Sequence, residues 1–165
     1  MVVSNTRPDI ATASVLHRLD QALALIERFA PHRFERLKLD VTALLIRRFA
    51  CRGAFYPDLR LCLVELTFLA HSDITPAQVA ASIVHEGTHA ELAAAAGLPL
   101  APADEERRCR QAEIEFGMAI PDGAAVLARA REALGMADGD VAPTIDWSVA
   151  RSRVNEADLG GLGSS

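Results

Sequence analysis

Residues 82–90 read Ser82-Ile83-Val84-His85-Glu86-Gly87-Thr88-His89-Ala90, a His-Glu-x-x-His pattern inside an apolar run. On a helix, residues four apart lie on one face with Cβ atoms about 5–6 Å apart, so His85 and His89 can hold one metal ion together. Glu86 then stands beside the first ligand, where it can take a proton from a metal-bound water. The pattern therefore predicts a Zn²⁺ site with Glu86 as its general base.

The sequence around this pattern predicts a helix over residues 76–96. Thr75 and Pro76 form an N-cap followed by proline at the first helical position, and Gln78 completes a capping box. Gly97 is the expected C′ residue. The helix is apolar almost all round, which is typical of one buried at the centre of a domain. The alternative without metal is that both histidines are core residues bonded to carbonyl groups.

The rest of the chain predicts helices on both sides of a short β-rich region. Apolar residues recur at helical spacing, and runs of β-branched and aromatic residues mark strands. Helices are expected at 14–30, 32–44, 102–119, 124–134 and 147–154, strands at 46–51 and 61–69, a loose leader at 1–12 and disorder at 156–165. This order predicts an α+β fold in which the central helix packs on a small mixed or antiparallel sheet, with a returning helix and further helices. We expect one domain over residues 1–135 and a partly disordered C-terminal extension over residues 136–165.

Composition indicates which kinds of partner and which cellular compartment to expect. The chain has 165 residues, half of them hydrophobic, and a formal net charge of −5, which favours no nucleic-acid partner and no membrane partner. Arg107, Arg108 and Arg110 lie among glutamates, so we expect a solvated face of mixed charge there. Three widely spaced cysteines and the lack of a signal-peptide pattern favour a reducing compartment. We expect a cytoplasmic protein.

A catalytic zinc site needs a third protein ligand, and the returning helix offers two glutamates. The metal would lie about nine residues, or ~13 Å, before the first helix ends. Glu113 lies about 9–11 residues, or ~14–16 Å, into an antiparallel returning helix, whereas Glu106 lies only about 2–4 residues in. We therefore expect Glu113 as the third ligand, with Glu106 as the alternative. Cys109 is either a small residue that permits close helix packing or a soft ligand, which is unusual in a hydrolytic site.

The segments that carry these residues resemble the gluzincin type of zinc metallopeptidase. More narrowly, they are similar to small uncharacterised bacterial proteins with a helix of the form Ile-Val-His-Glu-Ala-Thr-His-Ala and a second segment Glu-x-x-Cys-x-x-x-Glu-x-x-Phe that ends in Leu-Pro. Here the helix carries residues 83–90, and the second segment has Glu106, Cys109, Glu113 and Phe116 before Ile120-Pro121. The resemblance covers roughly residues 55–122. It implies a zincin-like domain and a metallopeptidase, without naming a substrate.

Two functions follow as hypotheses. The first is a zinc-dependent hydrolase, above all a peptidase, that acts on a peptide or protein substrate with Glu86 as general base. An extended peptide would add as a strand to the sheet edge nearest the metal, and Tyr56 or His71 are weak candidates for an oxyanion donor. The second hypothesis is a non-catalytic zinc-binding sensor or a module that binds a partner protein, because the chain is too short to build a large second lobe.

Overall fold

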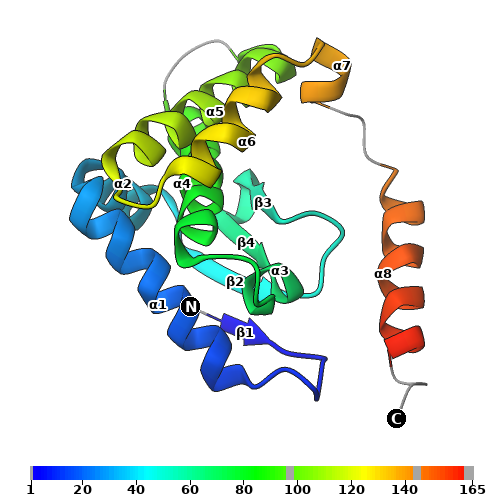
Figure 1. Cartoon of the computed structure of the whole chain (residues 1–165). Coiled ribbons are helices and arrows are strands. Elements are labelled where there is room, and N and C mark those ends of the chain that lie inside the picture. Colours follow the sequence, from blue (N-terminus) through cyan, green and yellow to red (C-terminus); the bar gives the residue numbers. More distant parts are fainter. Residues whose placement is uncertain (1, 96–98, 143–145, 162–165) are drawn as a thin grey trace.

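A four-stranded sheet and eight α-helices make up the described part of the chain, an α+β fold. The structure is a computed structural model and describes residues 2–95, 99–142 and 146–161. The elements in chain order are β1 (Val2–Ser4), α1 (Thr12–Phe29), α2 (Pro31–Asp40), β2 (Ala43–Arg47), β3 (Gly53–Tyr56), the 3₁₀ helix η1 (Pro57–Leu59), β4 (Leu61–Glu65), α3 (Leu66–Ala70), α4 (Pro76–Ala94), α5 (Pro102–Ala119), α6 (Ala124–Leu134), α7 (Asp138–Val141) and α8 (Trp147–Gly161). Figure 1 shows the sheet beside the central helix α4, with α8 apart from the rest of the fold.

The sheet is mixed, with the strand order β1-β2-β4-β3. Strands β1, β2 and β4 run parallel, with Ile46 of β2 between Val3 and Val64. Strand β3 pairs antiparallel with β4 and forms an edge of the sheet. This arrangement leaves the outer backbone edge of β3 without a neighbouring strand in the described sheet.

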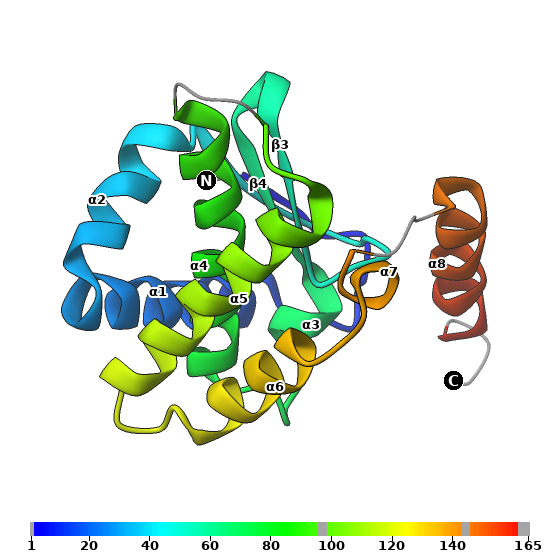
Figure 2. The same cartoon turned by 90° about the horizontal axis from the view of Figure 1, so that it is seen from above.

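Helix α4 is the centre of the fold because its sequence is apolar on nearly every side. It packs against α1, α2 and α5 and against strands β3 and β4 (Figure 2). Its first turn is fixed by the predicted capping box, in which the Gln78 amide nitrogen donates to Thr75 Oγ1 at 3.3 Å and the Thr75 amide nitrogen donates to Gln78 Oε1 at 2.9 Å. A rigid, buried helix of this kind can hold functional side chains at fixed positions.

The sequence predicted four of the eight described helices to within two residues. Helices α5 and α6 have the predicted bounds, and α1 and α4 agree within two residues. The prediction for 32–44 was too long, because the apolar residues after Asp40 enter the parallel strand β2. The prediction of a strand over 61–69 was wrong after Glu65, whose side chain accepts a hydrogen bond from the Phe68 amide and so caps α3.

The two ends of the chain also differ from expectation. Residues 2–4 of the predicted leader form strand β1, a segment too short for its periodicity to be read from sequence. Residues 156–161, expected to be disordered, belong to helix α8. Gly97 and residues 162–165 lie outside the described residues. Among the described helices, none combines the length and apolar character needed to span a bilayer.

Candidate metal centre

Helix α4 presents His85, Glu86 and His89 from two consecutive turns. His85 is 6 % exposed and Glu86 is 7 % exposed, and both side chains lie where α4 meets α5 and the sheet. His89 is half-buried at the same surface. Titratable side chains at this depth need polar or ionic partners, since burial without them is costly. Helix α5 supplies those partners.

Helix α5 runs antiparallel to α4, as the pairing of its glutamates with the histidines demonstrates. His89 Nδ1 lies 2.7 Å from Glu105 Oε1, and His85 Nδ1 lies 2.8 Å from Glu113 Oε1. The side chain of Glu106 lies between these two contacts. One turn of α5 carries Glu105 and Glu106, and Glu113 follows two turns later, so α5 brings three carboxylates to the two imidazoles.

The two Nε2 atoms and the Glu106 carboxylate form a small triangle of donor atoms. The Nε2 atoms of His85 and His89 are 3.2 Å apart, and Glu106 Oε2 and Oε1 lie 3.3 Å from His85 Nε2 and His89 Nε2, respectively. Zinc–ligand distances of 2.0–2.1 Å imply edges of about 3.3–3.4 Å in a tetrahedral site. The Nε2–Nε2 separation and the distance from each Nε2 atom to its own Glu106 oxygen are close to these edges.

The carboxylates at the two Nδ1 atoms give both imidazoles the orientation that metal-binding histidines need. A hydrogen bond from Nδ1–H to a carboxylate fixes the tautomer and leaves Nε2 as the free donor atom. Glu105 takes this position at His89 and Glu113 takes it at His85. Both histidines therefore direct Nε2 to the same point.

Glu113 is fully buried and is stabilised by two arginines. Arg110 Nη1 donates to Glu113 Oε1 at 2.7 Å, and Arg129 Nη2 from α6 donates to Glu113 Oε2 at 3.2 Å. Burial alone would raise the pKa of Glu113, but His85, Arg129 and Arg110 outweigh burial and lower it. The carboxylate therefore remains charged behind the His85 ring.

The same contacts determine the charge of the two histidines in the absence of metal. Burial disfavours the imidazolium form of His85, yet the hydrogen bonds to Glu106 and Glu113 raise its pKa to about 9. Burial opposes the charge on His89 as well, and Glu106 and Glu105 raise its pKa to about 9. The carboxyl of Glu106 has a pKa well below its usual range, because the imidazoles outweigh its burial. Positive charge at the Nε2 atoms is thus strongly stabilised.

The geometry favours Glu106, the alternative from the sequence, over Glu113 as the carboxylate that faces both Nε2 atoms. From the sequence, the rise per residue placed Glu113 level with the expected metal position. Glu113 does contact His85, but at Nδ1 rather than at Nε2. Two glutamates seven residues apart, or about 10 Å along α5, reach opposite nitrogens of one ring. An estimate based on axial rise cannot distinguish the two nitrogens.

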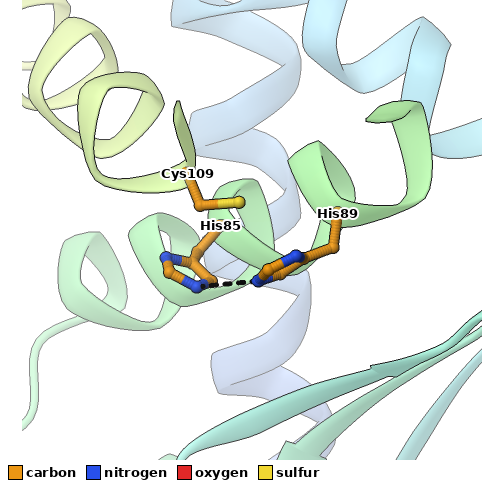
Figure 3. Close-up of side chains that lie close together, drawn as sticks. All are labelled: His85, His89 and Cys109. Atoms are coloured by element: carbon orange, nitrogen blue, oxygen red, sulfur yellow. Dashed lines mark hydrogen bonds between the residues drawn. The ribbon is translucent and has the colours of Figure 1, made fainter. Parts of the chain in front are cut away.

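Cys109 lies between these two glutamates on α5 and is completely buried. Figure 3 shows its side chain pointing toward the two imidazoles on α4. Its Sγ and one nitrogen from each of His85 and His89 lie within 4.8 Å of one another. Burial raises the pKa of this thiol to about 12. Cys109 is therefore a second candidate, besides Glu106, to join the two histidines at a metal ion.

Glu86 lies next to the triangle and against the edge strand. A Cβ atom added to Gly53 at the start of β3 would come within 2.7 Å of Glu86 Oε1, so a larger residue there would displace the Glu86 carboxylate. Burial raises the pKa of Glu86, while the charges of His85 and His89 oppose that effect. Glycine at position 53 thus lets the predicted base lie between the histidines and strand β3.

These side chains open into a cleft of about 620 Å³, which lies within the usual range for small-ligand sites, about 300–1,000 Å³. Its lining includes Glu86, both histidines and Glu106, together with Gly53–Phe55 of the edge strand. Residues from α6 and α7 complete the opposite wall. The donor atoms are therefore accessible from outside beside an unpaired strand edge.

Several functional residues differ from the sequence-based predictions. Tyr56 and His71 are exposed and do not line the cleft, so they offer no oxyanion donor in this conformation. The prediction of a solvated face was wrong for Arg110, which bonds to the buried Glu113. Its position three residues before Glu113 was a usable signal, whereas nothing in the sequence pointed to Arg129.

We compared the chain with models of known protein families, with curated proteins and with solved structures, and no match was found in any of the three.

Proposed function

We propose that the chain is a zinc-dependent hydrolase with a zincin-like arrangement, and that its substrates are peptides or proteins. The observation that carries this proposal is the triangle formed by His85 Nε2, His89 Nε2 and the Glu106 carboxylate, with edges of 3.2 and 3.3 Å, beside Glu86 in an open cleft. His85, His89 and Glu106 would hold the ion. Glu113 and Glu105 would orient the two imidazoles from behind.

Zinc bound by two histidines and one glutamate supplies a Lewis acid and a water with a pKa lowered to about 7. Glu86 acts as the general base, accepting a proton from the attacking water and then donating it to the leaving amine. Burial raises the pKa of Glu86, which makes its carboxylate a stronger base. The outer edge of β3 suits an extended peptide, whose backbone would hydrogen-bond to the strand beside Glu86.

One experiment separates catalysis from metal binding. Protein purified without a His-tag would be analysed for zinc and incubated with a peptide library, with and without a chelator. We expect one zinc per chain and cleavage that the chelator abolishes. The Glu86→Gln variant should keep its zinc and lose at least about 100-fold in rate, while Glu91→Gln, the same change outside the cleft on α4, should retain activity. Zinc-loaded protein that cleaves nothing, or equal rates for Glu86→Gln and the parent protein, would contradict the proposal.

A second candidate function is a zinc-binding sensor or partner-binding module without catalysis. The observation that favours it is Cys109, whose thiol lies near both histidines and would close the coordination sphere if it bound together with Glu106. A closed site of four protein ligands has no position for a reactive water. In that case Glu86→Gln should leave the biological effect of the protein unchanged.

A further inference from the structure

Three arginines line the cleft that holds the candidate metal centre. Arg110 comes from α5, Arg129 from α6, and Arg52 from the residue just before β3. The same cleft is lined by His85 and Glu86. A cluster of guanidinium groups beside a hydrolytic centre raises the question of which anion it binds.

The buried Glu113 neutralises only part of this charge. Arg110 and Arg129 both donate to its single carboxylate, so one negative charge is shared between two guanidinium groups. The Nε atom of Arg110 is buried and has no hydrogen-bond partner among the described residues. An orphaned donor of this kind is costly unless an acceptor reaches it.

Arg52 adds a third positive charge that faces the cleft. Its carbonyl accepts a hydrogen bond of 2.9 Å from the Glu65 amide, and its guanidinium lies 5.3 Å from the centroid of the Phe68 ring. No ion pair engages Arg52 within the described part of the chain. Partial burial lowers its pKa, and the charges of Arg129 and Arg110 lower it further against the opposing effect of Glu113, so the three guanidinium groups repel one another. The next residue, Gly53, contacts Glu86, which sets Arg52 beside the proposed base.

The acidic groups of the cleft leave the three arginines without a full set of partners. Glu86 lines the cleft, and the charge of Arg110 opposes the rise that burial causes in its pKa, but no ion pair joins Glu86 to an arginine in the described residues. Glu106 approaches Arg110 Nη2 only at 4.0 Å, and its oxygens face the two imidazoles. Glu132 and Asp140 are exposed on the α6–α7 wall, and neither forms an ion pair with the three arginines in the described residues. The arginines therefore retain capacity for an incoming anion.

We propose that Arg52, Arg110 and Arg129 form a subsite for a carboxylate group of the substrate, close to the bond that is cleaved. The planar guanidinium fork matches a carboxylate and can bind it with two parallel hydrogen bonds. The carboxylate is either the C-terminal end of a peptide or an acidic side chain. This inference rests on the proposed function, since it makes that same cleft selective for anionic substrates.

Two small zinc-binding probes test the subsite by calorimetry on zinc-loaded protein. Succinic monohydroxamic acid carries a hydroxamate for the metal and a free carboxylate, and its methyl ester lacks the charge. We expect the acid to bind at least about tenfold more tightly than the ester, because hydrogen bonds to charged groups are worth about 1.5–3 kcal/mol. Arg52→Gln should abolish this preference and Arg52→Lys should restore part of it. Arg131→Gln, which removes an exposed charge of α6 outside the cleft lining, should keep the full preference.

The outcomes separate this inference from the proposed function. If both probes bind equally to zinc-loaded protein, the carboxylate subsite is wrong while the open metal site stands. If zinc is present but neither probe binds, the metal site is closed, and both proposals are wrong. If Arg131→Gln loses the preference for the acid as completely as Arg52→Gln does, the preference reflects the net charge of the protein. The proposal of a carboxylate subsite is then wrong.

Peptides then identify the source of the carboxylate. Their dissociation constants would be measured on zinc-loaded Glu86→Gln protein, which should bind without turnover. Weaker binding after amidation of the C-terminus would assign the subsite to the chain end, and weaker binding after replacing an internal Glu by Gln would assign it to a side chain. Equal binding of all these peptides would overturn the proposal.

Discussion

His85 contacts a different carboxylate through each of its ring nitrogens. Glu113 meets Nδ1 at 2.8 Å and Glu106 faces Nε2 at 3.3 Å. The sequence showed that a carboxylate from the returning helix should approach the histidines, but it could not show which nitrogen each glutamate would reach. That choice depends on side-chain direction across the α4–α5 contact, which has no local sequence signal.

Glu105 contacts the Nδ1 atom of His89, on the side of the ring away from the proposed metal position. Its side chain is partly exposed, so it can be changed without disturbing the core. Loss of the carboxylate at His89 Nδ1 should weaken zinc binding about 10- to 100-fold. We expect this loss in Glu105→Gln from competition titrations with a zinc chelator. Asp104→Asn, a neighbouring charge removal on α5, should bind zinc as the parent protein does. Equal affinities for Glu105→Gln and the parent would show that this contact does not orient the ligand.

A substitution at Gly53 would test whether the position of the Glu86 carboxylate matters for catalysis. In Gly53→Ala the new methyl group would meet Glu86 Oε1 at 2.7 Å and displace the carboxylate. A displacement of about 1 Å can reduce a rate about 100-fold, so peptide cleavage should fall by roughly 10- to 100-fold with zinc content unchanged. Gly135→Ala is a suitable control, because a Cβ atom there would lie 3.5 Å from the Glu132 carbonyl oxygen, an ordinary van der Waals contact. Full activity in Gly53→Ala would argue against Glu86 as the base.

Helix α4 was the most predictable part of the fold. Its cap, its apolar surface and its metal-binding pattern all lie within one continuous segment, so local rules suffice. Strand β1 and the helix α3 could not be predicted in the same way. Strand β1 depends on pairing with β2, and α3 begins where Glu65 caps it after a strand. Both outcomes depend on contacts that the flanking sequence does not specify.

The N-cap of α4 gives a prediction of stability. Thr75→Ala removes the acceptor for the Gln78 amide and should lower the free energy of unfolding by about 0.5–2 kcal/mol. Urea unfolding monitored by circular dichroism would measure this change. Thr42→Ala, at an exposed position outside any helix, should have a smaller effect. A Thr75→Ala protein as stable as the parent would mean that burial of α4 alone determines where the helix starts.

Across the whole molecule, the three carboxylates around two histidines link stability, metal binding and pH. The folded pKa of each histidine is about 9, above the ordinary value of 6.5, so its stabilising contribution is complete below about pH 6.5 and is lost as pH rises through 9. Glu106 and Glu113 have lowered pKa values, so their contribution is present above about pH 4.5 and is lost as pH falls. Metal-free protein should therefore resist urea better at pH 6 than at pH 9.5. A higher urea midpoint at pH 9.5 would contradict these charge assignments.

Zinc binding should release protons, because zinc displaces them from the imidazoles. With the two Nε2 atoms 3.2 Å apart, protons on both repel each other, so we expect the release of at least one proton per zinc at pH 7. Calorimetric titrations in buffers of different ionisation enthalpy would count these protons. Zinc binding with no proton release at pH 7 would show that both histidines are neutral before the metal arrives.

In the proposed metal site, two imidazoles and the Glu106 carboxylate hold one zinc ion and leave a position for water. Zinc K-edge X-ray absorption on protein loaded with one zinc per chain tests this most directly. We expect two imidazole ligands and only nitrogen and oxygen neighbours, at about 2.0–2.2 Å. A sulfur neighbour at about 2.3 Å would instead identify Cys109 as a ligand, and it would contradict the open His85–His89–Glu106 site.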